Sequence, residues 1–144
     1  KQVKLHPSLF ENIKQQGHTV GNHTYSHING WKTKNKTYLE DIGKANQYIA
    51  SKWFRPPYGK AKPSQVKLIK KCGYQVVMWD VLAWEWRKDI PAEKSLQWLK
   101  KHTRPGSIVV LHDTQKNFQK LKDILPLYVD YLIAKGYRFE ALRD

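Results

Sequence analysis

The chain has 144 residues, 40% of them hydrophobic, so it is long enough to bury the core of one domain and its composition is not that of a disordered protein. It carries 26 lysine and arginine residues against 12 acidic ones, a net charge of +14 that suits solubility or a polyanionic partner. Cys72 is the only cysteine, which excludes an intrachain disulfide and a cysteine-ligated zinc site, and no apolar run is long enough to cross a bilayer.

Helix and strand patterns alternate along the first part of the chain. A helix is predicted over 7–16, because apolar side chains share one face and Gly17 follows as a stop. A short strand is predicted over 18–21. Thr37 and Glu40 have the spacing of a capping box, which predicts that a second helix begins at Thr37.

The same alternation continues through the middle of the chain. A third helix is predicted over 63–71, and the valine- and aromatic-rich run 74–81 is typical of a strand. Pro91 suits the first turn of a fourth helix, which we expect to end near His102. The apolar run 108–111 lacks alternation, as expected of a parallel strand buried on both faces.

The last predicted elements complete the pattern. Pro126 is predicted to start a helix that ends at Gly136, and 137–142 is predicted to be the last strand. Helices and strands in alternation, with short connections, predict a parallel α/β fold, and we expect residues 1–144 to form a single domain. Polar residues just past the carboxyl ends of parallel strands usually form the active site of such folds.

Two histidines four residues apart are the first candidates for chemistry. His23 and His27 lie in a polar segment, and this spacing lets two imidazoles face one metal from a helical turn or a tight loop. A pair of ordinary surface histidines is the alternative that the spacing alone leaves open.

A proline-rich turn is the second candidate. Consecutive prolines within 55–59 exclude a helix and favour a rigid turn. Such a turn can hold the Arg55 guanidinium and the Tyr58 backbone N–H in fixed positions, as carboxylate orientation and oxyanion binding require. A solvated arginine on an ordinary loop is the alternative.

Aromatic and acidic residues gather at the end of the predicted strand 74–81 and just after it. Aromatic faces stack on sugar rings, so Trp79 and Trp86 are candidate walls of a sugar-binding site beside Glu85, with core packing as the alternative. His112 ends the most apolar strand, where a general acid or base is useful, although a structural histidine is also common there.

Taken in chain order, the segments 17–27, 55–59, 79–86 and 108–113 resemble the motifs of the polysaccharide deacetylase family, also called the NodB-homology family or carbohydrate esterase family 4. The resemblance implies a distorted (β/α) barrel with mostly parallel strands, partial or truncated in this chain. It implies a metal-dependent hydrolase that removes N-acetyl or O-acetyl groups from a polysaccharide such as peptidoglycan or a chitin-like glycan. It also implies a divalent metal cofactor, with zinc as the expected ion.

The resemblance assigns roles to residues of the first two motifs. It implies that His23 and His27 are metal ligands. Arg55 is expected to hold the carboxylate of the catalytic base. The backbone N–H of Tyr58 is expected to help bind the tetrahedral oxyanion, which places Tyr58 at the substrate.

It also assigns roles to residues of the last two motifs. His112 is expected to be the general acid that protonates the leaving amine, and Leu111 is expected to shape the acetyl pocket. The carboxylate that supports this histidine is usually an aspartate before a tryptophan in the family. Glu85 occupies that place here, and Asp80 is an alternative for the same role.

The chain departs from the family pattern in one respect. It contains no Asp-Asp pair, the motif that supplies the catalytic base and the third metal ligand in the family. Two histidines alone bind zinc weakly, since catalytic zinc normally has three protein ligands. Because the only methionine is Met78, we expect the first strands to lie upstream in a longer protein, and this chain alone to be inactive or nearly so.

Three functions remain open on the sequence. The first is a deacetylase of an acetylated polysaccharide, working outside the cytoplasm or in the cell envelope as the family usually does. The second is a catalytically inactive carbohydrate-binding homologue, which an Asp-Asp pair in the full gene would exclude. The third, a basic nucleic-acid-binding domain, ranks last because it leaves the ordered motifs unexplained.

Overall fold

The computed structural model describes residues 2–142. Its contacts group into two compact units. The first runs up to Met78 and includes the segment from Ala141, and the second is Trp79–Glu140. Each unit has a hydrophobic cluster of its own.

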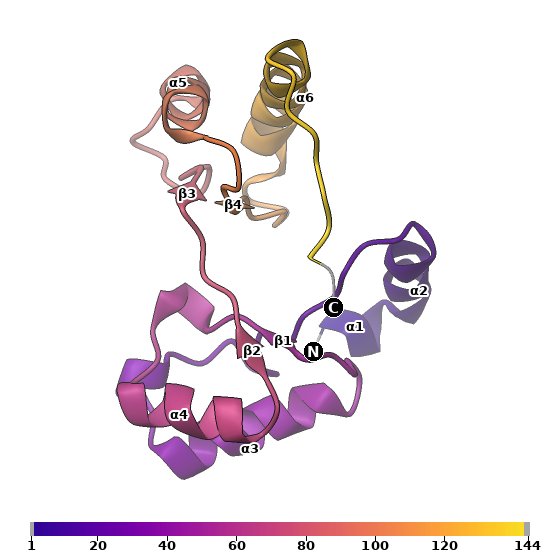
Figure 1. Cartoon of the computed structure of the whole chain (residues 1–144), viewed down its shortest axis with the longest axis vertical. Coiled ribbons are helices and arrows are strands. Elements are labelled where there is room, and N and C mark those ends of the chain that lie inside the picture. The colour runs from indigo at the N-terminus through magenta and orange to yellow at the C-terminus, as the bar shows by residue number, and fades with distance from the viewer. Residues whose placement is uncertain (1, 143–144) are drawn as a thin grey trace. The chain divides into compact units, whose positions relative to one another are not determined.

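Within its described residues, the first unit contains two parallel strands and four α-helices. Its elements are α1 (Gln2–Leu5), α2 (Pro7–Gln15), α3 (Asn35–Asn46), β1 (Trp53–Phe54), α4 (Pro63–Lys71) and β2 (Gln75–Val76), with 3₁₀ turns at Gly30–Lys32 and Pro57–Gly59. Strands β1 and β2 pair in parallel, with Trp53 opposite Gln75, and Asn22 forms a further parallel bridge to Phe54. Helices α3 and α4 lie side by side in this unit (Figure 1).

The core of the first unit joins these elements. Tyr38 and Ile42 are one helical turn apart on α3, so they present one apolar face. This face packs with Phe54 of β1 and Ile69 of α4, all of them nearly inaccessible to solvent. This cluster holds β1 in place against α3. It therefore also positions the segment that follows β1 and the segments that pair with it.

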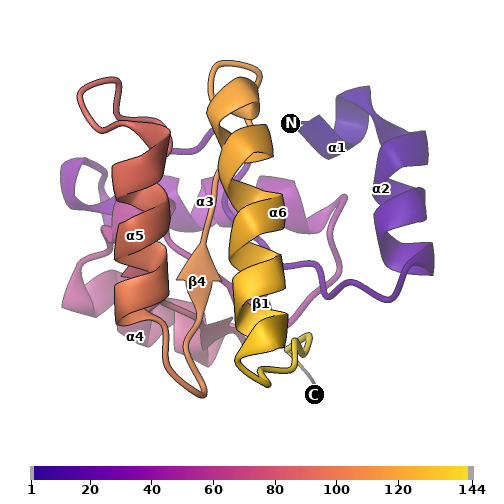
Figure 2. The same cartoon turned by 90° about the horizontal axis from the view of Figure 1, so that it is seen from above.

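The second unit is a strand pair beside two helices. Its elements are β3 (Val81–Leu82), α5 (Ala92–His102), β4 (Val109–Val110) and α6 (Phe118–Ala134). Strands β3 and β4 pair in parallel, with Val81 opposite Val109. Figure 2 shows α5 and α6 side by side next to β4. The buried residues of this core are Val81, Ala83, Leu99, Ile124, Tyr128 and Leu132.

Most predicted helices are confirmed. The helices predicted over 7–16, 63–71 and from Pro91 correspond to α2, α4 and α5. Helix α3 begins at Asn35 after an extended Lys34, so the prediction of a start at Thr37 is wrong. The single strand predicted over 74–81 is also wrong, because β2 and β3 pair with different partners and the intervening residues pair with neither.

Two predictions for the C-terminal part are wrong. Helix α6 begins at Phe118, and Pro126 lies inside it rather than at its start. The preceding two turns are helical because Leu121 and Ile124 are buried in the core, and this burial outweighs the backbone hydrogen bond that a proline cannot donate. Residues 137–142 form no strand, since within residues 2–142 they pair with no other strand.

The parallel pairing agrees with the predicted α/β class. The prediction of a single domain over 1–144 stays a prediction. Among the helices of residues 2–142, none is both long and apolar enough to cross a membrane.

Candidate metal and acid–base sites

The two candidate metal ligands lie on a tight loop that follows Asn22. Thr24 and His27 both have left-handed backbone angles, with φ of 64° and 55°, so the loop turns sharply between the histidines. The centroids of the His23 and His27 rings are 4.9 Å apart. Two imidazoles bound to one tetrahedral zinc, with Zn–N distances of about 2.0–2.1 Å, have centroids roughly 5 Å apart. The pair therefore fits a shared divalent ion.

The orientation of the His23 ring is set by the proline-rich turn. His23 Nδ1 lies 2.7 Å from the carbonyl oxygen of Arg55. A carbonyl oxygen only accepts hydrogen bonds, so Nδ1 carries the proton and Nε2 carries the lone pair of the neutral ring. Metal-binding histidines commonly donate their second nitrogen to a carbonyl or carboxylate in this way.

Asp41 holds the histidine loop from α3. Its carboxylate is buried, and Oδ2 accepts hydrogen bonds from the backbone N–H groups of Tyr25 and Ser26 at 3.0 and 2.9 Å. Sequence reasoning missed this residue, because a single aspartate in a helix gives no local sign of a partner in a distant loop. The only available signal was an acidic residue on the face of α3 that also carries apolar core residues.

Asn22 supports the same loop from the strand side. It is fully buried, its Oδ1 accepts the backbone N–H of Thr24 at 2.9 Å, and its Nδ2 donates to the Ile42 carbonyl at 3.1 Å. The side chains of Asn22 and Asp41 therefore fix the backbone of the loop between the two histidines. A loop fixed in this way can present two imidazoles with little loss of entropy on metal binding.

The proline-rich turn holds Arg55 and Tyr58. The guanidinium of Arg55 donates to the carbonyls of Val77 and Met78 at 3.2 and 3.3 Å, and burial lowers its pKa. Tyr58 has a left-handed backbone, with φ of 59°, and its ring lies edge-on to His27 with 4.7 Å between centroids. The aromatic ring thus borders the histidine pair.

The second unit holds a histidine–carboxylate pair. Glu85 is 3% exposed, and its Oε1 lies 2.6 Å from both the backbone nitrogen and the ring Nδ1 of His112. The Trp86 ring is edge-on to the imidazole, with 4.7 Å between centroids. Because Nδ1 faces the carboxylate, Nε2 is the nitrogen left for proton transfer to a substrate.

Asp80, the alternative support for this histidine, has another partner. Its carboxylate accepts the backbone N–H of Ile108 at 2.9 Å and so joins the starts of the two strands. Glu85 is therefore the carboxylate that contacts His112.

The sequence model of the polysaccharide deacetylase family matches residues 1–77. The chain belongs to this family. It is 32% identical over 143 residues to a peptidoglycan-N-acetylglucosamine deacetylase of Bacillus cereus, covering 94% of this chain and 52% of the relative. The chain spans about half the length of several curated relatives that it matches.

Solved structures of polysaccharide deacetylases have the same fold. The crystal structure of the Bc1960 peptidoglycan N-acetylglucosamine deacetylase superposes with a TM-score of 0.85 and 29% identity, covering 97% of this chain and 68% of that one. A carbohydrate esterase family 4 pseudoenzyme from Bacillus anthracis superposes with a TM-score of 0.78 and 25% identity, covering 94% and 50%. The predicted family and its (β/α) barrel fold class are therefore confirmed.

The predicted site residues of this polysaccharide deacetylase chain fall into two groups. His23, His27, Arg55 and Tyr58 lie together in the first unit, and Glu85, Trp86 and His112 lie together in the second. Their catalytic roles stay predictions. In the part of the chain that the structure describes, no group of three or more metal-ligating side chains occurs.

Two predicted substrate-binding residues lie next to the strands of the second unit. Leu111 is half-buried and packs against the core of the second unit, next in sequence to His112. Trp79 is half-buried just before β3. Both stay predicted substrate contacts.

Proposed function

We propose that the protein is a metal-dependent deacetylase that hydrolyses N-acetyl groups of an N-acetylglucosamine-containing glycan of the cell envelope. Membership of the polysaccharide deacetylase family gives the reaction class, and the relative named as a peptidoglycan-N-acetylglucosamine deacetylase gives the substrate class. The observation that carries the proposal is the histidine pair, with rings 4.9 Å apart and His23 Nδ1 hydrogen-bonded to a carbonyl.

The chain's own residues supply binding and proton transfer. His23 and His27 would hold a divalent ion, for which zinc suits two neutral imidazoles. When bound, such an ion polarises the acetyl carbonyl and lowers the pKa of a water ligand. The Tyr58 backbone N–H would stabilise the negative charge that develops on the carbonyl oxygen.

His112 would complete the hydrolysis. As the water oxygen bonds to the carbonyl carbon and the C–N bond breaks, the protonated Nε2 gives its proton to the leaving nitrogen, yielding acetate and a free amine. Glu85 forms an ion pair with the protonated ring and keeps Nδ1 turned away from the substrate. The water proton would go to a carboxylate of the Asp-Asp motif, which this chain does not contain, and Arg55 would orient that carboxylate.

The proposal is tested by acetate release from N-acetylated glycans. We expect the full-length product of the gene to be active, and this chain, which contains no Asp-Asp pair, to be inactive or nearly so. His112→Ala should lower kcat by about 10²–10⁴-fold and leave zinc content unchanged. A full-length protein that binds zinc but releases no acetate from either peptidoglycan or chitin would contradict the proposal.

A catalytically inactive carbohydrate-binding homologue is the second candidate. The likeness to a family 4 pseudoenzyme is the observation that favours it. In this case the full-length protein would bind acetylated glycan with unchanged affinity after His112→Ala and would release no acetate.

A further inference from the structure

The surface of the first unit around the starts of α3 and α4 is strongly basic. Two short segments form it, 31–36 and 60–62, and neither contains an acidic residue. The lysines of these segments form no ion pair with any described residue. We use the name lysine–tryptophan surface for the set Trp31, Lys32, Lys34, Lys36, Lys60 and Lys62.

Buried hydrogen bonds hold the two segments together. The backbone N–H of Gly30 donates to the Lys60 carbonyl at 3.0 Å, and a Cβ atom at Gly30 would collide with that oxygen. The fully buried Gln65 donates through Nε2 to the carbonyls of Gly30 and Thr33, at 2.9 and 3.1 Å. Its Oε1 accepts the backbone N–H of Lys62 at 2.9 Å. The segments are therefore fixed relative to each other.

Side-chain contacts bring the lysines of the two segments to one place. Lys62 Nζ donates to the carbonyl oxygen of Thr33 at 2.8 Å. The side chains of Asn35 and Ser64 form a hydrogen bond of 3.2 Å, which joins the start of α3 to the start of α4. The lysines on either side of Asn35 therefore lie beside the start of α4.

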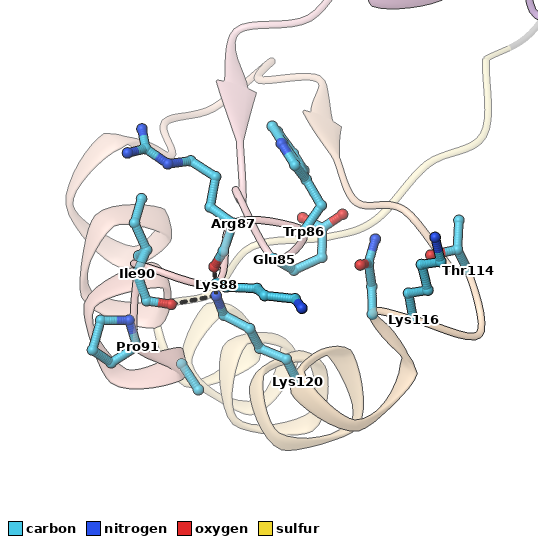
Figure 3. A pocket seen from close by; sticks show the side chains of 11 residues that line it. Glu85, Trp86, Arg87, Lys88, Ile90, Pro91, Thr114, Lys116 and Lys120 are labelled. Carbon is cyan, nitrogen blue, oxygen red and sulfur yellow. Dashed lines mark hydrogen bonds between the residues drawn. The ribbon is translucent and has the colours of Figure 1, made fainter.

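The lysines that precede and open α3 have free ammonium groups. Lys32, Lys34 and Lys36 are exposed, and their ammonium groups form no hydrogen bond within the part of the chain that the structure describes. Lys120 of the second unit differs from them. It lines a pocket beside Glu85, where its Nζ donates to two carbonyls of the loop after β3 (Figure 3). The basic segments of the first unit can therefore act on an external anion.

Trp31 adds an apolar group to this basic surface. Its side chain is 59% exposed, although its Nε1–H donates to the Ala61 carbonyl at 3.3 Å. Because this donor is already paired, the indole ring can leave water without an unpaired polar group. Lys60 Nζ lies over the ring, 5.1 Å from its centroid, so an ammonium group covers one face that a base or sugar could stack on. A paired tryptophan among lysines suits the interface of a membrane, where tryptophan is enriched.

We propose that the lysine–tryptophan surface docks on a membrane that carries anionic phospholipid head groups. The ammonium groups contact the lipid phosphates, and the Trp31 ring enters the interface between head groups and acyl chains. The flexible lysine stems let the charges stay among the head groups while the ring is buried. A soluble polyanion pairs with the lysines but leaves the ring in water.

The docking surface lies close to the candidate metal site along the chain. Trp31 follows His27 by four residues, a stretch of at most about 14 Å. Docking would therefore hold the histidine loop near the lipid surface. This proposal goes beyond the deacetylase proposal and does not depend on it.

The direct test is co-sedimentation of the full chain with lipid vesicles. The probe vesicles contain equal parts of phosphatidylglycerol and phosphatidylcholine, and the comparison vesicles contain phosphatidylcholine alone. We expect at least about tenfold tighter binding to the anionic vesicles, and a smaller difference as salt rises, because exposed charges are screened. Equal binding to the two kinds of vesicle would overturn the proposal.

Paired lysine variants locate the binding surface. Lys32→Gln with Lys34→Gln should weaken binding to the anionic vesicles about tenfold, because each lysine near an anionic surface contributes attraction. The matched control, Lys70→Gln with Lys71→Gln, removes the same charge at exposed positions in the last turn of α4 and should cost less than about threefold. Equal losses in both double variants mean a general charge effect and contradict a defined surface.

Tryptophan variants separate a membrane from a soluble polyanion. Trp31→Ala should weaken vesicle binding about tenfold, whereas Trp31→Phe should retain most of it, because an aromatic ring still enters the interface. Neither variant should change binding of oligo(dT), a soluble phosphodiester polymer. The membrane assignment is wrong if Trp31→Ala binds vesicles as the wild type does. It is equally wrong if oligo(dT) binds more tightly than the vesicles at the same phosphate concentration.

Vesicle binding and deacetylation can fail separately. Sedimentation needs neither metal nor turnover, so His23→Ala should bind anionic vesicles as the wild type does. Vesicle binding by the chain together with no acetate release by the full-length protein keeps the docking surface and loses the enzyme. Acetate release without any preference of the chain for anionic vesicles keeps the enzyme and loses the docking surface.

Discussion

At the scale of single residues, the contact between Glu85 and His112 explains why a glutamate can serve at this position. Its Oε1 accepts from both the ring and the backbone of the histidine, so the longer side chain still reaches Nδ1. A buried carboxylate that fixes an imidazole in this way sets which nitrogen faces the substrate.

This arrangement predicts the behaviour of Glu85 variants in the full-length protein. Glu85→Gln keeps a hydrogen-bond acceptor but removes the negative charge, so kcat should fall about 10²-fold while KM changes little. Asp80→Asn is the control, because Asp80 bonds to the Ile108 backbone, and it should retain kcat. Steady-state kinetics of both variants decide between the two carboxylates, and a larger loss for Asp80→Asn would contradict the assignment to Glu85.

Tyr38 gives a second prediction at this scale. It is fully buried, its hydroxyl has no partner among the described residues, and burial, together with the nearby Asp41 carboxylate, raises its pKa to about 12 from 10.0. The folded state therefore holds the proton more tightly than the unfolded state. The contribution of Tyr38 to the free energy of unfolding is therefore fully present below pH 10. It is lost as the pH rises from 10 toward 12, because Tyr38 ionises first in the unfolded chain.

Replacing Tyr38 by phenylalanine should reduce this alkaline loss and leave the part that comes from Tyr74 and Tyr128, whose pKa values burial also raises. At pH 7 the Tyr38→Phe variant should be as stable as the wild type or about 1 kcal/mol more stable, since it removes an unpaired buried hydroxyl. Urea unfolding at several pH values measures both effects, with Tyr131→Phe as the control. An unchanged alkaline loss in Tyr38→Phe would contradict the assignment.

At the scale of elements, the loop that carries His23 and His27 depends on α3. The Asp41 carboxylate accepts two backbone N–H groups from the turn between the histidines. The helix thus acts on the candidate metal site without providing a ligand, as outer-shell groups commonly do.

Weakening this contact should lower metal affinity. Asp41→Asn keeps the size of the side chain and one acceptor oxygen but removes the negative charge that strengthens both hydrogen bonds, so we expect zinc affinity to fall about 10–100-fold. Competition with a zinc indicator measures this change, and Asp130→Asn, at an exposed position of α6, should have no effect. If both variants bind zinc as the wild type does, the loop does not depend on α3.

Element boundaries show where sequence reasoning succeeds and fails. Helices α2 and α4 could be predicted because a proline at the first turn and a glycine beyond the end act locally. The start of α6 could not, because the burial of Leu121 and Ile124 depends on packing against distant elements. The break between β2 and β3 also depends on distant partners, since each pairs with a different strand.

At the scale of the whole molecule, the order and spacing of the four motifs indicate the candidate site, whereas no single motif does. The sequence placed His23, His27 and Arg55 in motifs whose residues the structure brings into contact within the first unit. It did not reveal Asp41, or the pocket beside Glu85, because both depend on residues that are distant in sequence.

Zinc binding by the histidine pair is the most direct test of the proposed chemistry. In a titration of the full-length protein, the wild type and a His6→Ala control should bind about one zinc per chain. His23→Ala and His27→Ala should each bind at least about tenfold more weakly, because each removes one of the ligands. Unchanged zinc affinity in both ligand variants would contradict a metal site at these two imidazoles.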